Sequence, residues 1–128
     1  MQAFTFHIDI EKPFSNLTMS DHVLIMIKTA DGRLIVSRKD SYPPGIWRLI
    51  GGKINKKEKL ADTAKRELSE ETQLSIPSSR ISYLAAIRGE ATDAEFNEYA
   101  LTTHIYLVNL KSSEEPKASD DIDELQAI

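Results

Sequence analysis

Only one stretch of this 128-residue chain carries the periodicity of a helix, and this limits the folds that the chain can adopt. In residues 60–73 the apolar side chains of Leu60, Ala64 and Leu68 recur at helical spacing and form one stripe. The segments on either side are short, rich in Val and Ile, and separated by turn residues, as expected for strands. Strands around a single clear helix predict the α+β class with a mixed sheet, not a repeated βαβ unit.

The predicted strands lie on both sides of this helix. We expect them at residues 3–10, 22–28, 33–38, 46–50, 81–88 and 100–110. An Asp-Gly pair at 31–32 predicts a hairpin turn between the second and the third of these strands. The acidic stretch 89–99 predicts a loop of about a dozen residues, a length that favours a functional role. Residues 124–128 fit either a last short strand or the start of a helix.

Length and composition exclude several classes of protein. A chain of 128 residues predicts one domain, residues 1–128. The absence of cysteine excludes disulfides, thiolate metal sites and cysteine nucleophiles. The net charge of −4 gives no support for binding to long nucleic acids, which usually requires a basic surface. The first ten residues lack the pattern of a signal peptide, and no apolar run can span a bilayer, so we expect a cytoplasmic protein with no membrane partner.

Three glutamates near the end of the predicted helix carry the strongest chemical signal. Glu67, Glu70 and Glu71 are spaced i, i+3 and i+4, so a helix places their carboxylates on one face. Like charges at this spacing repel, and the helix dipole disfavours negative charge in the last turns. A hard divalent cation would reverse this balance, because Mg²⁺ prefers carboxylate oxygens together with water and substrate phosphate. For the three residues alone, the alternative is an ordinary solvated helix face.

The residues before the helix can complete such a site. Gly51 and Gly52 allow the backbone to approach a ligand closely, and their carbonyl groups are further candidate metal ligands. Glu58, near the helix start, can reach the same place across the loop. Arg66 precedes Glu70 by four residues and can orient carboxylates through charge-assisted hydrogen bonds.

The segment from Gly52 to Leu74 resembles the Nudix box. That motif is a glycine, five residues, a glutamate, seven residues, and then Arg-Glu-apolar-x-Glu-Glu-x-Gly-apolar. In this chain Gly52 and Glu58 take the first two places, and residues 66–74 read Arg-Glu-Leu-Ser-Glu-Glu-Thr-Gln-Leu. Eight of nine specified positions match, and Gln73 replaces the second glycine. Glycine there usually takes the left-handed conformation that ends a helix, which costs glutamine about 1 kcal/mol.

The resemblance implies a fold and an activity. The fold would be the Nudix α/β/α sandwich around a mixed sheet, with a C-terminal helix that is short or absent after residues 121–128. One face of the sheet would then be under-covered, which favours a homodimer. The activity would be that of a pyrophosphohydrolase that uses Mg²⁺, with Mn²⁺ as a substitute. Water activated by the metal would attack phosphorus and split a diphosphate linkage in a nucleotide-like small molecule.

The resemblance also implies roles for single residues. The metal ligands would be Glu67, Glu70 and Glu71, with help from the carbonyl of Gly51 or Gly52. The catalytic group would comprise Glu58, Arg66, Glu70 and Glu71. The general base would be either Glu70 or Glu71 in the box, or a glutamate from the following loop, namely Glu90, Glu95 or Glu98. The candidate substrate contacts are Arg38, Tyr42, Trp47, Arg48, Lys53 and Glu98.

Two other functions fit parts of the pattern. A non-catalytic Nudix-like module that binds a nucleotide or a protein is favoured by Gln73 and by the short region after the last strand. An isomerase of prenyl diphosphates on the same fold would require a cysteine, which this chain lacks. The substrate depends on loops outside the box, so oxidised nucleoside triphosphates, ADP-ribose-like compounds and capped RNA ends all stay open. The low basic charge disfavours long RNA.

Overall fold

The computed structural model describes residues 2–9, 21–40 and 45–128, and strands are the main regular structure in these ranges. Within them the helices are α1 (Leu60–Thr72) and the short 3-10 helix η1 (Ser78–Arg80). The strands are β1 (Gln2–Asp9), β2 (His22–Lys28), β3 (Ile35–Arg38), β4 (Trp47–Arg48), β5 (Ile50–Lys53), β6 (Ser82–Thr92), β7 (Glu98–Asn109) and β8 (Glu124–Ala127). In the part of the chain that is described, no helix has the length and apolar character needed to cross a membrane.

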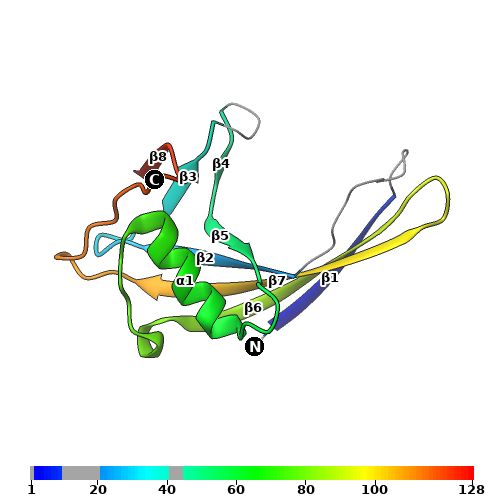
Figure 1. Cartoon of the computed structure of the whole chain (residues 1–128), viewed down its shortest axis with the longest axis horizontal. Coiled ribbons are helices and arrows are strands. Elements are labelled where there is room, and N and C mark those ends of the chain that lie inside the picture. The colour runs from blue at the N-terminus through cyan, green and yellow to red at the C-terminus, as the bar shows by residue number, and fades with distance from the viewer. Residues whose placement is uncertain (1, 10–20, 41–44) are drawn as a thin grey trace.

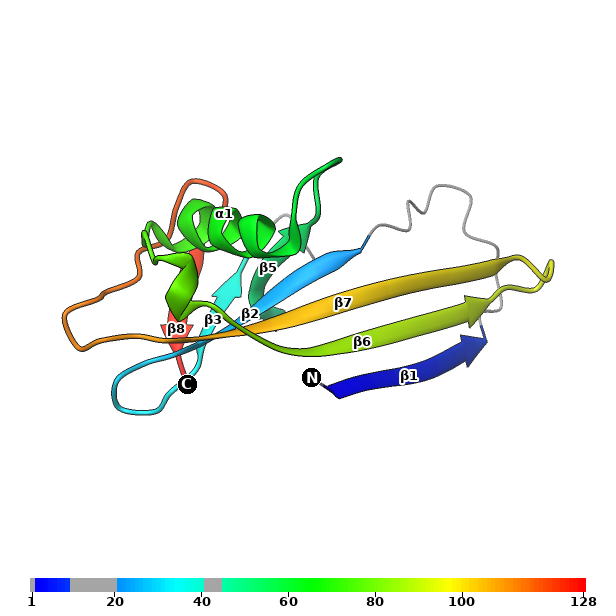
Figure 2. The same ribbon diagram turned by 90° about the horizontal axis from the view of Figure 1, so that it is seen from below.

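The strands form two sheets, shown in Figures 1 and 2. The larger sheet has the order β1-β6-β7-β2-β5 and is mixed, because β1 runs parallel to β6 and β2 parallel to β7, whereas the other neighbours are antiparallel. The smaller sheet, of order β4-β3-β8, is antiparallel. The predicted α+β class with a mixed sheet is confirmed. Residues 124–127 adopt the strand alternative and not the helical one.

Helix α1 packs on the larger sheet through the predicted apolar stripe. Ala64 and Leu68 are fully buried, as are Val23, Ile25 and Ile27 on β2. Burial of each Leu, Ile or Val side chain stabilises the folded state by roughly 1.5–3 kcal/mol. The helix lies over β5 and β2, so the face that carries the three glutamates is held next to the strand that carries the paired glycines.

The hairpin β6–β7 extends far beyond α1, with β1 alongside it (Figure 1). The predicted loop of about a dozen residues at 89–99 is wrong, because both strands continue into it and only residues 93–97 separate them. Charged residues misled the prediction, since strands that face water tolerate them well. The buried carboxylate of Asp93 closes the turn by accepting hydrogen bonds from the backbone of Glu95 and Asn97, both at 2.9 Å.

The turn at residues 31–32 forms, but the hairpin predicted around it is incomplete. Gly32 takes the positive φ of 87° and donates its N–H to the Thr29 carbonyl at 2.9 Å. A single bridge between Lys28 and Leu34 follows. After it, β3 leaves β2 and pairs with β4 and β8 in the smaller sheet, so the return strand begins at Ile35 and not at residue 33.

Candidate metal and active site

Gly51 and Gly52 lie beneath α1, and a side chain at each would meet a different obstacle. A Cβ atom on Gly51 would stand 2.1 Å from the Val23 carbonyl oxygen, so a side chain there would push β5 away from β2. A Cβ atom on Gly52 would stand 2.4 Å from Oε1 of Glu67. The first glycine therefore keeps the sheet closed. The second leaves room for a carboxylate from the helix.

Arg66 is the centre of a hydrogen-bond network that joins the helix to the loop before it. Its Nε and Nη2 atoms donate to the two carboxylate oxygens of Glu58, at 2.8 and 3.0 Å. Its Nη1 atom donates to Glu67 at 3.0 Å and to Glu70 at 3.1 Å. Nη2 also donates to the Lys53 carbonyl at 3.1 Å. One guanidinium group, 26% exposed, thus orients three carboxylates, and such charge-assisted bonds are the strong ones.

Glu58 serves this network as a fixed anion. Besides Arg66, its Oε1 atom accepts hydrogen bonds from the Thr63 hydroxyl at 2.7 Å and from the Asn55 backbone N–H at 3.2 Å. The bonds from Arg66, followed by that from Thr63, lower the pKa of Glu58 to about 2. Lys59, the N-cap residue, makes no side-chain capping bond. Glu58 therefore joins the loop before α1 to the side chains of Thr63 and Arg66 on the helix.

Glu71 has the opposite environment. Its side chain is nearly buried, with the residue 7% exposed, and its Oε2 atom accepts a hydrogen bond from the Gly51 N–H at 2.8 Å. Burial raises the pKa of Glu71 to about 7, although the Gly51 bond and the charges of Arg48 and Lys39 act in the other direction. Burial also raises the pKa of Glu67, whose charge in turn raises that of Glu71. A buried and a half-buried carboxylate that repel each other are costly unless a cation joins them.

The donor chemistry of these residues fits a hard divalent cation. Glu67 and Glu71 offer carboxylate oxygens beside the backbone of β5, which is the ligand set that Mg²⁺ prefers. Glu70 is more exposed, at 48%, and points to Arg66. In the ranges 2–9, 21–40 and 45–128, no three acidic or histidine side chains already converge on one point. Metal binding would therefore require the glutamate side chains to leave their present hydrogen bonds and move towards one another.

Two of the predicted substrate contacts line an open pocket beside the glycines. Arg48 and Lys53 lie on its wall, and its volume is about 290 Å³. Gly51 and Gly52, predicted as metal ligands, also line it, whereas His22, Leu24 and Leu49 were not predicted. The alternation along β2 was the available signal, because it turns His22 and Leu24 to the face opposite the buried side chains of that strand.

Arg38 and Trp47 lie in the smaller sheet. Arg38 forms ion pairs with Asp40 and with Glu124, the latter at 3.1 Å. Its guanidinium carbon lies 5.8 Å from the ring centroid of Trp47, within the range of a cation–π contact. These contacts join β3 to β4 and β8. Tyr42, another predicted substrate contact, lies outside the described residues.

The three glutamates that the sequence offered as an alternative general base are not brought to the box. Glu90 lies on β6 and pairs with Arg88 at 3.0 Å, whereas Glu95 and Glu98 lie at the tip of the hairpin. This tip is far from α1 in Figure 1. Glu90 and Glu98 instead line a separate pocket of about 360 Å³ between β1, β6 and β7.

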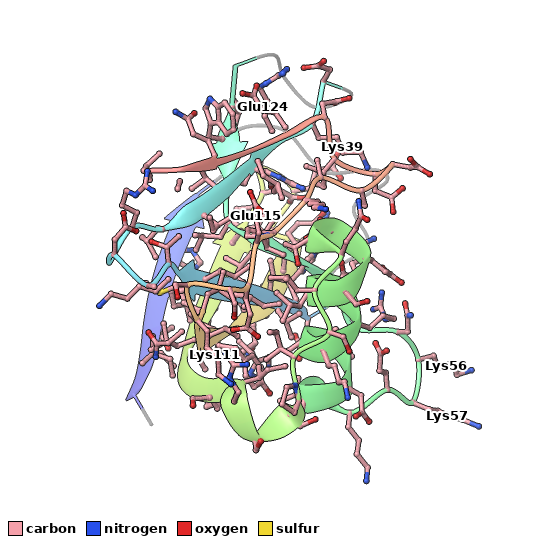
Figure 3. The ribbon with its side chains drawn as sticks, turned by 90° about the vertical axis from the view of Figure 1, so that its left-hand side faces the viewer. Lys39, Lys56, Lys57, Lys111, Glu115 and Glu124 are labelled. Atoms are coloured by element: carbon pink, nitrogen blue, oxygen red, sulfur yellow. The ribbon has the colours of Figure 1, made fainter. Side chains whose placement is uncertain are left out.

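Lys39 is a site residue that the sequence pattern did not single out. It follows β3, and Figure 3 shows it on the side of the molecule where the C-terminal end of α1 lies. Its charge is one of those that lower the pKa of Glu71. By contrast, Lys56 and Lys57 point into solvent from the loop before α1 (Figure 3). No periodicity marks Lys39, because β3 reaches α1 only through the tertiary fold.

Residues 19–128 match the family model of the NUDIX domain. The chain belongs to the NUDIX family. Solved NUDIX structures share its fold. A MutT/nudix family protein from Enterococcus faecalis superposes with a TM-score of 0.71 and 22% identity, over 91% of this chain and 46% of that protein. The chain thus spans about half the length of that relative. No protein with a curated description matches the NUDIX chain by sequence.

Two further structures with a similar fold were solved with ligands. The NUDIX domain of NrtR from Shewanella oneidensis, in complex with ADP ribose, gives a TM-score of 0.67 and 21% identity over 91% of this chain and 76% of that one. A bifunctional NMN adenylyltransferase/ADP ribose pyrophosphatase from Francisella tularensis, in complex with AMP and a Mn ion, gives 0.64 and 19% over 90% of this chain and 35% of that one. At these identities the likeness shows the fold alone.

Proposed function

We propose that this NUDIX protein is a hydrolase that uses Mg²⁺ or Mn²⁺ to cleave the diphosphate linkage of a nucleoside di- or triphosphate derivative. One observation carries the proposal. The charged residues that the motif specifies lie together, where Arg66 orients three carboxylates and the nearly buried Glu71 accepts a hydrogen bond from the Gly51 N–H. A purely structural role does not require a buried and a half-buried glutamate that repel each other beside β5.

Each residue has a separate task in this proposal. Glu67 and Glu71 would hold the metal, with a glycine carbonyl of β5. When bound, the metal would lower the pKa of a water molecule and neutralise phosphate charge. Glu70 is the better of the two general-base candidates in the box, because it is half exposed whereas Glu71 is enclosed. Arg66 would keep Glu67 and Glu70 oriented through its hydrogen bonds.

The substrate would lie across the pocket beside Gly51. Arg48 and Lys53 give this pocket positive charge, which suits phosphate oxygens, and Leu24 and Leu49 give it an apolar wall, which suits a base or a sugar. The ligands named in the two neighbouring structures, ADP ribose and AMP, have this combination of groups. A small nucleotide derivative is therefore the substrate class that we propose.

Product analysis tests this function. The protein is incubated with nucleoside triphosphates, nucleotide sugars, ADP-ribose and dinucleotides, in Mg²⁺ and in chelator, with ¹⁸O-labelled water. We expect metal-dependent release of two phosphorylated products, one of which carries the label. Glu71→Gln should reduce turnover by orders of magnitude. Glu115→Gln, at an exposed glutamate outside the box (Figure 3), should leave turnover unchanged.

A binding module without catalysis is the second candidate. It is favoured because the carboxylates of Glu58, Glu67 and Glu70 already accept hydrogen bonds from Arg66. Among the described residues, no three carboxylates are therefore arranged in advance to hold a metal ion. Tight binding of one of the nucleotides with no turnover, in Mg²⁺ and with the protein folded, would establish this alternative and reject the hydrolase.

A further inference from the structure

Gln73, the residue that departs from the box pattern, makes contacts that a glycine cannot make. It takes the left-handed conformation that ends α1, with φ 61° and ψ 19°, and its backbone N–H donates to the Ser69 carbonyl at 3.0 Å. Its side-chain Nε2 atom donates to the Ala118 carbonyl at 2.8 Å. Next to it, the Lys117 N–H donates to the Thr72 carbonyl at 2.8 Å. The segment before β8 is thus fastened to the end of the helix immediately after Glu71.

The same segment is fastened at its other end to the residues around Lys39. The Asp123 N–H donates to the Arg38 carbonyl at 3.0 Å, and the Asp123 carboxylate accepts from the Asp40 N–H at 2.5 Å. Between the two ends, Ile122 is buried with 4% exposure. We call residues 117–123 the strap. At one end of the strap, the bonded residues Thr72 and Gln73 directly follow Glu71. At the other end, the bonded residues Arg38 and Asp40 stand on either side of Lys39.

We propose that the strap positions Lys39 beside the Glu71 end of α1, and that Gln73 and Asp123 are the positioning residues at its two ends. Lys39 then presents a cation next to the carboxylates, where an anionic diphosphate would meet it. Figure 3 shows Lys39 on the side of the molecule where the C-terminal end of α1 lies, which agrees with this placement. The inference rests on the proposed function in one respect, namely that Glu71 binds metal.

The energies agree with this role for Gln73. The strain of a left-handed glutamine, which glycine avoids, and the gain from one hydrogen bond are similar in size. The two therefore nearly cancel, so Gln73 gives little net stability. Its side chain instead provides a hydrogen bond between the helix and the strap, across 45 positions of sequence.

Hydrogen exchange tests the strap without any need for turnover. Gln73→Met keeps the side-chain length but loses the donor, whereas Gln73→Lys keeps a donor that reaches the Ala118 carbonyl. Gln126→Met, at an exposed glutamine on β8, is the matched control. We expect the Lys117 amide to exchange about fivefold faster in Gln73→Met, and at the wild-type rate in Gln73→Lys and Gln126→Met. An unchanged rate in Gln73→Met would overturn the proposal.

A double-mutant cycle on Mg²⁺ affinity tests whether the strap acts through Lys39. Lys39→Met removes a cation near the metal ligands and should tighten Mg²⁺ binding about threefold in the wild-type background, the size expected for a partly screened charge. In the Gln73→Met background this factor should fall towards one, because Lys39 is no longer held in place. The same factor in both backgrounds would show that Lys39 is positioned without the strap, and it would overturn the inference.

The two proposals fail in different ways. If the protein binds Mg²⁺ and shows this coupling but hydrolyses no nucleotide, the hydrolase is rejected and the strap stands. If the protein hydrolyses a substrate but the Lys117 amide of Gln73→Met exchanges at the wild-type rate, the role of the strap is rejected and the hydrolase stands.

Discussion

The two ends of α1 are held in different ways. At the N-terminal end, Arg66 and Glu58 join the helix to the loop directly before it, through bonds that span 8 positions of sequence. At the C-terminal end, Gln73 and the strap span 45. The first end is built by the motif itself and the second by the rest of the fold. The difference teaches that a sequence motif can specify its own anchor, while the geometry of the end that we propose binds metal depends on distant residues.

The two ends also differ in electrostatics. Glu58 and Glu71 belong to the same box, yet the pKa of Glu58 is lowered to about 2 and that of Glu71 is raised to about 7. A paired arginine causes the first shift and burial causes the second. Carboxylates whose environments separate their pKa values in this way have separate tasks. We assign anchoring to Glu58 and metal binding to Glu71.

The largest effect is expected from breaking the N-terminal anchor. Arg66→Met leaves three carboxylates without their shared guanidinium, and we expect the free energy of unfolding to fall by about 3–4 kcal/mol. Chemical denaturation measures this. Arg88→Met, which breaks the exposed pair with Glu90, is the control and should cost less than about 1 kcal/mol. Equal losses for the two variants would contradict the central role given to Arg66.

The next largest effect concerns the buried end, and it is a gain in stability. The folded pKa of Glu71 lies above its unfolded value, so its ionisation costs stability progressively as pH rises from about 4.5 to about 7. In chelator at pH 8, Glu71→Gln should therefore be more stable than wild type by about 2–3 kcal/mol. The difference should vanish near pH 4.5 in urea denaturation. A variant that is less stable at pH 8 would show that Glu71 is not strained by burial.

Sequence spacing was enough to predict the helix, the positions of most strands along the chain and the residues of the box. Glu58, Arg66 and Glu67 were found because their contacts lie within one helix and its preceding loop. Lys39 was missed, since nothing local relates it to Glu71. The hairpin at 89–99 was misread as a loop because its pairing partners, and not its composition, make it a strand.

A smaller effect on stability is expected from a substitution at Gly52 on β5, next to Glu67. The Cβ atom of Gly52→Ala would press only on the carboxylate end of Glu67, which is a flexible side chain, so the loss should stay below about 1 kcal/mol. Because Glu67 must move, Mg²⁺ affinity should nevertheless fall. Thermal denaturation measures the loss of stability, and titration calorimetry measures the loss of Mg²⁺ affinity. Unchanged Mg²⁺ affinity would remove Glu67 from the proposed ligands.

The smallest effect is expected at Glu58, and it should disappear in acid. The folded pKa of Glu58 lies below its unfolded value, so its contribution is present above about pH 4.5 and is lost as pH falls towards 2. Glu58→Gln should lower stability at neutral pH, and its stability should converge with that of wild type at low pH. This slope is opposite in sign to that expected at Glu71. Parallel pH profiles for the two variants would contradict the separation of their roles.

The most direct test of the account is a calorimetric titration of Mg²⁺ into the wild-type protein and into Glu71→Gln at pH 8. The account predicts that the wild type binds Mg²⁺ and that the variant, although more stable, binds it at least about tenfold more weakly, since it has lost a charged ligand. Equal affinity in the two proteins would contradict it, because the glutamates of α1 would then not form the metal site.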